Sequence, residues 1–450
     1  MAVLGIPYAT AVRFERPRPV PLADVSECVA FGPAPPQRPG ADLVPGSPIV
    51  DTDEHRCLTL NVWPARTVDE LRPVLVWFYG GSFVTGASSQ ACFDGTRLAA
   101  EQDVVVVSVN YRLGALGFLD LRALGGSVAN LGLHDALCAL RWVRDNIAAL
   151  GGDPRRVTVF GESAGGGMCA HLLASPLAHG LFRGAIVQSG VTEHTLDAER
   201  AALVATTFAR LAGAPSSDEL RALPLDAVLD AQTATIAELL PTVGMMPFHP
   251  VIDGEVLLAA PAAALGAGVA TGVPLLAGTT ADEMRLYLDP ALPPPTHARL
   301  VRRVEKYLGV GAERAEQIVA AYVGDAGPDA WPAIFGDNEM QLPLRRVLDA
   351  QAAHAPVYAY LFTWEAPSVG AAHAVDIPFI LGNFTDGWAE FVGHDADAER
   401  LSAEMRATWA RFAATGEPGW GRYPVTMVWG RRSYVAPEHP FTRRLAALAG

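Results

Sequence analysis

The stretch VTVFGESAG, residues 157–165, decides the fold class of this chain. Residues 157–160 have the length and the β-branched and aromatic composition of a buried strand. Ser163 follows, flanked by Gly161 and Gly165, and the next residues are small and apolar, as at the start of a helix. A serine in this setting is typical of a nucleophile elbow, where a sharp turn holds the side chain in a strained conformation above a sheet. The stretch predicts a buried strand, a reactive serine and a helix in direct succession.

Short apolar runs like this one recur along the chain, at residues 74–79, 104–109, 185–188, 273–276 and 357–362. They are apolar on both faces, as in parallel strands that helices cover from both sides. Segments with a helical spacing of apolar residues separate them, at residues 135–149, 164–174, 198–211, 298–308 and 344–354. Alternation of strands and helices predicts an α/β fold with a mostly parallel sheet.

The chain has 450 residues, which could form one large α/β domain or two fused ones. No internal repeat and no clean linker is visible, so we expect a single domain over residues 1–450. The stretches near 192–242 and 290–355 are mostly helical, and we expect them to be insertions over a site. The Pro-rich stretch 32–48 is predicted to be an exposed, extended loop.

Composition excludes several classes of function. The chain has 34 basic and 48 acidic residues, a net charge of -14, which disfavours binding to a nucleic acid backbone. Lys306 is its single lysine, so phosphate-binding loops and Schiff-base cofactors lack the amine that they require. With 50% hydrophobic and 18% charged residues, we expect a globular protein.

Five cysteines at irregular spacing form no zinc-binding pattern, and no signal peptide is visible at the start. We therefore expect a reducing, cytoplasmic location, with Cys138 and Cys169 as core residues. Residues 256–281 carry no charge and are long enough to span a membrane. Pro261, Pro274 and several glycines interrupt them, so we expect a short helix, a turn and a strand, and no membrane span.

A serine hydroxyl needs a nearby base, and the base needs an anionic partner. Of the eleven histidines, His373 is the one downstream of Ser163 that lies on a loop after a predicted strand, although a surface histidine would fit that place too. The acid is expected after the strand at 273–276, where Asp282 and Glu283 are adjacent. Spacing does not choose between them, and either could simply be a charge at a helix N-terminus.

Acyl transfer also needs hydrogen-bond donors for the developing oxyanion. One is the backbone N–H after the nucleophile, that of Ala164. Others are expected from the segment YGGSF, residues 79–83, where small residues after a strand let main-chain N–H groups approach the site. A simple turn is the alternative interpretation of this segment.

Ordered blocks over nearly the whole chain resemble the type B carboxylesterase family, the carboxylesterase and cholinesterase branch of the α/β-hydrolases. The resemblance begins at GIPYA, residues 5–9, and extends beyond Trp409. It is carried by CLTLNVW (57–63), residues 77–83, NYRLG (110–114), residues 130–152 with GGDP, residues 160–166 and 278–283, and His373 with IPF (377–379). It implies the α/β-hydrolase fold and hydrolysis of carboxylic esters.

By this resemblance, the nucleophile is Ser163, the acid is Glu283 rather than Asp282, and the general base is His373. The oxyanion-hole positions fall on Gly81, Ser82 and Ala164. Glu162 and Ser189 match positions that the family uses around the triad, but plain packing would explain both, so we assign them no role.

Three positions depart from the family pattern. Ser82 replaces a glycine or small residue, but it can still donate its backbone N–H. Tyr79 stands where a histidine is frequent. In secreted members Cys57 would pair with a cysteine at a position near Pro35, and Pro35 is not a cysteine, which agrees with an intracellular location.

We therefore expect a serine carboxylesterase that forms an acyl-enzyme on Ser163 and acts on a small-molecule ester. It would need no metal or organic cofactor, bind no nucleic acid, and exist as a monomer or weak oligomer. The alternatives are a non-catalytic binding protein of the same family and an acyltransferase with the same triad. The sequence does not predict the natural ester.

Overall fold

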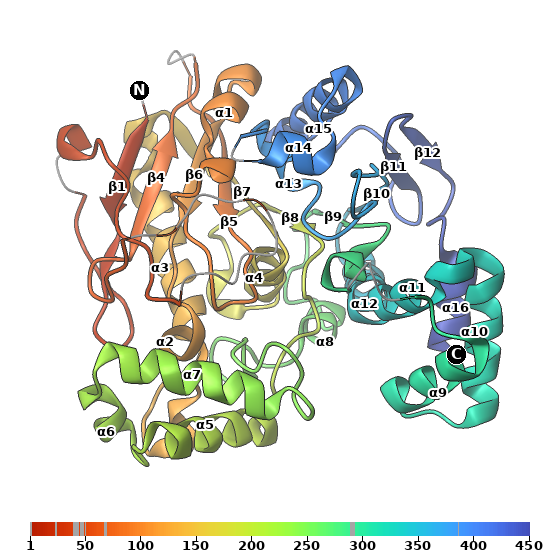
Figure 1. The fold of residues 1–450 in the computed structure, drawn as a ribbon. Helices are drawn as coiled ribbons and strands as arrows, with labels where there is room; N and C mark the ends of the chain where they lie inside the picture. The colour runs from red at the N-terminus through yellow and green to blue at the C-terminus, as the bar shows by residue number, and fades with distance from the viewer. Residues whose placement is uncertain are drawn as a thin grey trace.

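The computed structural model describes residues 2–22, 25–38, 45, 49, 51–66, 70–288, 293–385 and 387–450. Within this part of the chain, ten strands form one sheet that extends from one side of the molecule to the other (Figure 1). In spatial order its strands are β1 (Val3–Pro7), β4 (Thr59–Trp63), β6 (Val105–Val109), β5 (Arg72–Phe78), β7 (Gly152–Glu162), β8 (Gly184–Gln188), β9 (Leu275–Thr280), β10 (Val357–Phe362), β11 (Thr426–Trp429) and β12 (Tyr434–Ala436). A separate hairpin joins β2 (Ala9–Thr10) to β3 (Arg18–Pro19).

The middle of the sheet is parallel, from β6 through β5, β7, β8, β9 and β10 to β11. Antiparallel strands lie at both ends, β1 and β4 at one and β12 at the other. All residues of β6, β8, β9 and β10 are buried. Each predicted apolar run falls on one of these strands, and the predicted mostly parallel α/β sheet is confirmed.

Strand β9 extends further than the sequence predicts. It continues through Gly278 to Thr280, although residues 278–280 read as a loop. A Cβ atom on Gly278 would lie 2.4 Å from the ring of Tyr360 on β10, so the glycine leaves room for that ring rather than making a turn. Glu283 consequently follows almost directly after a buried strand.

Helices cover both faces of the sheet (Figure 1). On one face lie α3 (Leu131–Asn146), α4 (Ala164–Leu173), α8 (Pro261–Gly266) and α12 (Leu342–Ala352). On the other lie α1 (Thr96–Gln102), α13 (Ile377–Leu381) and α15 (Ala396–Thr415), with α14 (Trp388–Val392) near them. The short helix α2 (Gly114–Phe118) packs on α3. As predicted, Cys138 and Cys169 are buried in α3 and α4.

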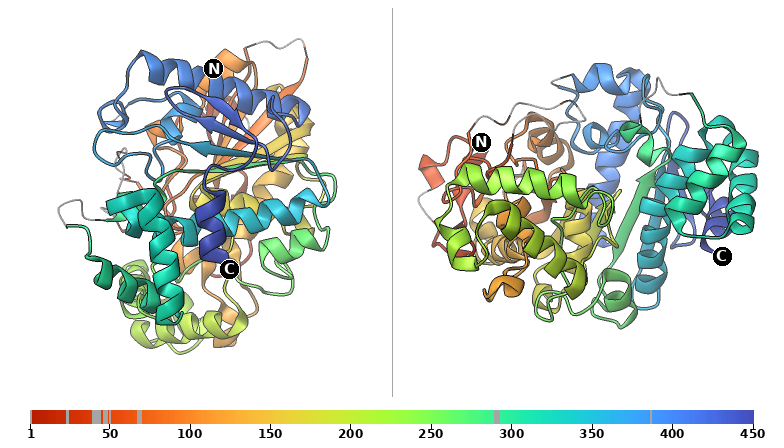
Figure 2. Two further views of the ribbon diagram at one scale, coloured as in Figure 1. Left: turned by 90° about the vertical axis from the view of Figure 1, so that its right-hand side faces the viewer. Right: turned by 60° about the horizontal axis from the view of Figure 1, so that its bottom comes forward.

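Both stretches that were predicted to be helical contain helices in the structure. Residues 192–242 contain α5 (Ala198–Ala212), α6 (Ser217–Ala222) and α7 (Leu225–Leu239). The second stretch contains α9 (His297–Leu308), α10 (Ala312–Ala326), α11 (Ala330–Gly336), the π-helical segment Asp337–Gln341 and α12, which follows that segment directly. Residues 290–292 of the prediction lie outside the described residues. Helix α10 packs against α9 and against the C-terminal helix α16 (Thr442–Ala449) (Figure 2).

The uncharged stretch 256–281 folds as expected, into helix α8, a turn and strand β9. Among the described residues, no helix combines the length and the apolar character that a membrane crossing requires.

The Pro-rich stretch is not the exposed loop that was predicted. Residues 34–37 are buried, whereas residues 39–44 and 46–48 lie outside the described part of the chain. Ala34 donates its N–H to Asp51 and accepts that of Asp53, and Asn110 donates to the carbonyl of Pro33. Prolines lack an N–H donor, so this extended segment can be buried with few donors left to satisfy.

Candidate active site

Ser163 lies on a sharp turn between β7 and α4. Its φ and ψ of 56° and -123° are unusual for a side-chain-bearing residue, which marks local strain. A Cβ atom on Gly161 would lie 2.5 Å from the backbone of Gly165, and one on Gly165 would lie 1.9 Å from the carbonyl oxygen of Phe78. The predicted strand, serine and helix occur in succession, and the two glycines are required by close backbone contacts.

Replacing Gly165 by alanine should therefore strongly destabilise the protein. The new methyl group would overlap backbone atoms that cannot move independently, and we expect a loss of about 3 kcal/mol or more in the free energy of unfolding. The matched control is Gly324→Ala in α10, where an added Cβ atom meets no atom within 4 Å beyond the backbone of its own helix. Thermal unfolding of both variants measures the difference. Equal melting temperatures would show that the elbow tolerates a side chain.

His373 and Glu283 meet in the interior, although they are far apart in the sequence. His373 Nδ1 lies 2.6 Å from Glu283 Oε2, and the two residues are 3% and 2% exposed. Glu283 begins a short 3₁₀ helix just after β9, and its Oε1 accepts the N–H of Thr280 at 2.8 Å. The N–H of His373 donates to the Glu283 carbonyl at 3.2 Å. The carboxylate and the imidazole are thus held by backbone as well as side-chain contacts.

Asp282 takes a different place from its neighbour. Its Oδ2 accepts the N–H of Ala371 at 3.1 Å, and its side chain is 34% exposed beside Arg285. Spacing in the sequence does not choose between Asp282 and Glu283. In the structure, the carboxylate of Glu283 contacts the imidazole of His373, whereas that of Asp282 bonds to Ala371.

Ser163 and His373 line the same cavity, together with Gly80, Gly81 and Ser82. In the described part of the chain, no hydrogen bond joins the serine hydroxyl to His373 Nε2. That nitrogen lies 3.2 Å from Glu162 Oε1 instead. Hydrogen bonds in unliganded active sites are frequently long and tighten only when substrate binds. The three predicted side chains therefore share one site in which the serine and the imidazole are not yet bonded.

Glu162, to which the sequence analysis assigned no role, also lines this cavity. Burial raises the pKa of its carboxyl, while the neighbouring His373 imidazole acts in the opposite direction and favours the ionised form. Burial lowers the pKa of His373, but the Glu162 and Glu283 carboxylates outweigh this effect and raise it above its usual value. The available signal was its place next to Ser163, since the residue beside a nucleophile at a strand end must lie near the site.

Gln188, at the end of β8, connects the elbow to the loop of His373. Its carbonyl accepts the N–H of Ser163 at 3.0 Å, and its Nε2 donates to Asp376 Oδ2 at 3.1 Å. Trp409 Nε1 donates to Gln188 Oε1 at 3.2 Å. Sequence reasoning missed Gln188 and Asp376; a polar side chain that ends an otherwise apolar strand was the only signal.

Residues 80–86 form a tight loop beside Ser163. Gly81, Ser82 and Phe83 have positive φ values of 113°, 54° and 60°, and the Gly81 carbonyl accepts the N–H groups of Val84 and Thr85. The backbone N–H groups of Gly81, Ser82 and Ala164 donate to no other residue in the part of the chain that the structure describes. Gly81 and Ser82 line the cavity that contains Ser163, and Ala164 follows Ser163 directly at the start of α4.

Two cavities meet at Ser82 and Ser163. The first, of about 170 Å³, includes His373 and is lined with aromatic and aliphatic side chains, among them Phe93, Ile377 and Trp388. The second, of about 260 Å³, is lined by Met245, Met246, Met284 and Met340, and by the polar side chains of His194 and Glu339. Tyr287 borders both.

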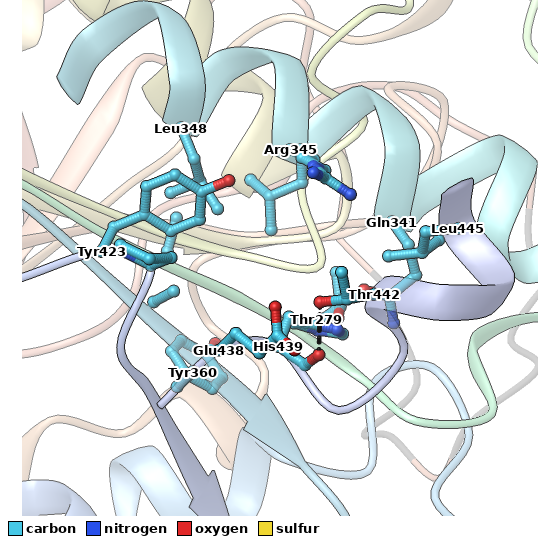
Figure 3. A pocket seen from close by; sticks show the side chains of 14 residues that line it. Thr279, Gln341, Arg345, Leu348, Tyr360, Tyr423, Glu438, His439, Thr442 and Leu445 are labelled. Atoms are coloured by element: carbon cyan, nitrogen blue, oxygen red, sulfur yellow. Dashed lines mark hydrogen bonds between the residues drawn. The ribbon is translucent and has the colours of Figure 1, made fainter. Parts of the chain in front are cut away.

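Another cavity, of about 70 Å³, lies against α12, β9 and β10 (Figure 3). Side chains from α12, such as Arg345 and Leu348, face Tyr423, Glu438 and His439 across it. Burial lowers the pKa of His439 to about 4, which keeps this imidazole neutral at physiological pH. None of the predicted site residues lines this cavity.

Residues 1–431 match the model of a family described as "Carboxylesterase family". The chain belongs to the carboxylesterase family. Para-nitrobenzyl esterase of Bacillus subtilis (strain 168) is 36% identical over 430 residues, which cover 92% of this chain and 86% of that protein. Phenmedipham hydrolase of Pseudarthrobacter oxydans is 33% identical over 94% of this chain and 87% of its own length.

A solved Geobacillus stearothermophilus carboxylesterase superposes with a TM-score of 0.86 at 35% identity, covering 99% of this chain and 96% of that one. A solved PNB esterase gives the same TM-score and identity over 99% and 95% of the two chains. This carboxylesterase therefore has the α/β-hydrolase fold and is a hydrolase that acts on carboxylic esters. The resemblance inferred from the sequence is confirmed. The relatives are esterases and hydrolases, which favours an enzyme over a non-catalytic binding protein.

Proposed function

We propose that this carboxylesterase cleaves its ester through an acyl-enzyme on Ser163, with His373 as general base and Glu283 as the partner of the imidazole. The observation that carries the proposal is the buried 2.6 Å contact between His373 and Glu283 at the cavity that contains Ser163. A carboxylate on Nδ1 fixes the tautomer that leaves Nε2 free to accept a proton.

In the first half-reaction, the Ser163 hydroxyl attacks the ester carbonyl carbon while His373 Nε2 takes its proton. The carbonyl oxygen becomes an oxyanion, which the N–H groups of Gly81, Ser82 and Ala164 stabilise. Glu283 stabilises the imidazolium through Nδ1–H. The imidazolium then protonates the leaving oxygen, the C–O bond breaks, and the alcohol departs.

In the second half-reaction, water attacks the acyl carbon and His373 takes one of its protons. The same N–H groups stabilise the resulting tetrahedral oxyanion. When it collapses, the bond to Ser163 breaks, the serine oxygen regains a proton from His373, and the carboxylic acid is released. Each turnover consumes one water and one ester and restores the enzyme, and no cofactor takes part in any of these steps.

The two cavities can be assigned from the same chemistry. The leaving oxygen must receive its proton from His373, and among the described lining residues His373 borders the first cavity and not the second. The alcohol part of the ester is therefore assigned to the first cavity, and the acyl part to the methionine-lined one. Methionine side chains are flexible and adapt to irregular shapes, so we expect several acyl groups to be accepted.

Incubation with p-nitrophenyl esters of increasing acyl length, with and without an added alcohol, tests this function. Hydrolysis should release p-nitrophenol and the free acid, with the acid as the main product even when alcohol is present. Formation of a new ester as the main product would contradict hydrolysis and favour an acyltransferase.

The pH dependence of kcat/KM should report the raised pKa of His373. The imidazole must be neutral to act as a base, so activity is lost as the pH falls through its pKa in the free enzyme. We expect the acidic limb above the ordinary histidine value of about 6.5. Glu162→Gln removes one of the carboxylates that raise this pKa and should move the limb down by about 1 pH unit.

Asp282→Asn is the control for this pH profile, because it alters a carboxylate that does not contact the imidazole. It should leave the limb in place. An acidic limb that stays unchanged in Glu162→Gln would show that Glu162 has no electrostatic effect on the base.

A further inference from the structure

The side chain of Gln37 reaches from the buried Pro-rich segment into the loop at residues 80–86. Its Nε2 donates to the Gly86 carbonyl at 2.9 Å, and its Oε1 accepts the Gly86 N–H at 2.8 Å. The same Nε2 also donates to the carbonyl of Pro35 at 2.9 Å. Gln37 is 8% exposed, so these hydrogen bonds form away from bulk water. One amide side chain thus satisfies both backbone polar groups of Gly86.

Gly86 closes the loop that begins at Gly80. Its φ is 112°, and a Cβ atom there would lie 2.5 Å from the Tyr79 ring and 2.8 Å from the Gly80 carbonyl oxygen. The two ends of the loop are therefore in direct contact. A shift of Gly86 would move Gly80 with it, and with Gly80 the donor groups that follow.

Contacts inside the loop also link the position of Gly86 to that of Gly81. The Gly81 carbonyl accepts the N–H groups of Val84 at 2.9 Å and Thr85 at 3.0 Å. A Cβ atom on Gly81 would lie 2.2 Å from the Thr85 carbonyl oxygen. Since Thr85 precedes Gly86, a fixed Gly86 also fixes the orientation of the Gly81 and Ser82 peptides.

Hydrogen bonds fix the segment that carries Gln37. The Pro33 carbonyl accepts Asn110 Nδ2 at 3.2 Å, and Asn110 follows directly after β6. Ala34 exchanges two backbone hydrogen bonds with the segment at residues 51–53, at 2.9 and 3.1 Å. Pro35 and Pro36 restrict φ in the residues between. The amide of Gln37 is thereby anchored to the central sheet rather than to a free loop.

We propose that Gln37 is a positioning residue for ester hydrolysis, which braces the loop carrying the N–H groups of Gly81 and Ser82. The inference rests on the proposed function, in which these groups stabilise the oxyanion. Donors stabilise a transition state only when they are already oriented toward it. Without Gln37, the buried N–H and carbonyl of Gly86 would lose their partners, and the loop would rearrange to satisfy them.

Gln37→Met tests this role, because methionine keeps the length of the side chain and removes its donor and acceptor. We expect kcat to fall about 10- to 100-fold, as for displaced catalytic groups, while KM changes less than about 3-fold. Affinity for an aryl trifluoromethyl ketone, whose serine adduct places an oxyanion in the hole, should fall by the same factor as kcat/KM. Amide hydrogen exchange in residues 80–86 should become faster.

The matched control is Gln351→Met. Gln351 is also buried, and its Nε2 also bridges two loop carbonyls, those of Ala270 at 3.0 Å and Val273 at 2.8 Å. This variant should lose a similar amount of thermal stability and keep kcat within about 2-fold, because its loop carries no oxyanion donors. If Gln37→Met does not fold, Gln37→Asn keeps the amide and shortens its reach by one methylene group, and a folded Gln37→Asn should also lower kcat.

The inference is overturned if folded Gln37→Met keeps the kcat of the wild type, if Gln351→Met lowers kcat equally, or if exchange in residues 80–86 is unchanged. Failure of the proposed function would look different. In that case Ser163→Ala would retain activity, whereas the exchange measurement would still show whether Gln37 braces the loop.

Discussion

Ser163→Ala is expected to lower kcat for a short p-nitrophenyl ester by about 10⁴-fold or more, since loss of a catalytic serine removes the covalent route altogether. The fold should survive, because the hydroxyl is replaced by a smaller group and the positive φ at this position is set by the backbone. Steady-state hydrolysis and a thermal melt of the purified variant measure both effects. Hydrolysis at the rate of the wild type would exclude Ser163 as the nucleophile.

Glu283→Gln should have the second largest effect, a loss of about 10³- to 10⁴-fold in kcat. An amide at this place stabilises the wrong tautomer of the imidazole and no longer balances its positive charge. KM should change little, because Glu283 lies behind His373 and is 2% exposed.

The neighbouring carboxylate supplies the control for Glu283→Gln. Asp282→Asn makes the same chemical change one residue away, at a side chain that bonds to Ala371 rather than to the imidazole. It should retain activity within about 3-fold, because asparagine keeps an oxygen to accept that N–H. Equal losses in the two variants would mean that the triad acid has been assigned to the wrong residue.

The sequence could predict the sheet because its strands are short apolar runs, a property visible in each run by itself. It could not predict the full extent of β9, since Gly278 belongs to that strand only because Tyr360 of β10 occupies the space beside it. For the same reason, the burial of residues 34–37 was not foreseen. It depends on partners at Asn110 and residues 51–53.

The residues of the candidate site also differ in whether the local sequence predicts them. Ser163 could be predicted because the elbow is a contiguous pattern whose glycines are required locally. The contact of Glu283 with His373 depends on how a short helix leaves β9, which spacing does not reveal; the family pattern supplied the choice. Gln37 and Gln188 went unnoticed because a single glutamine in a sequence looks like a surface residue until its distant partners are known.

Direct detection of the acyl-enzyme tests the central claim most sharply. The enzyme is mixed with an ester that deacylates slowly, quenched in acid within the first turnover, digested, and analysed by peptide mass spectrometry. We predict that the mass of one acyl group is added to the peptide that contains Ser163, and that it disappears with further incubation. An acyl group on another residue, or hydrolysis with no acylated peptide at any time, would contradict the mechanism.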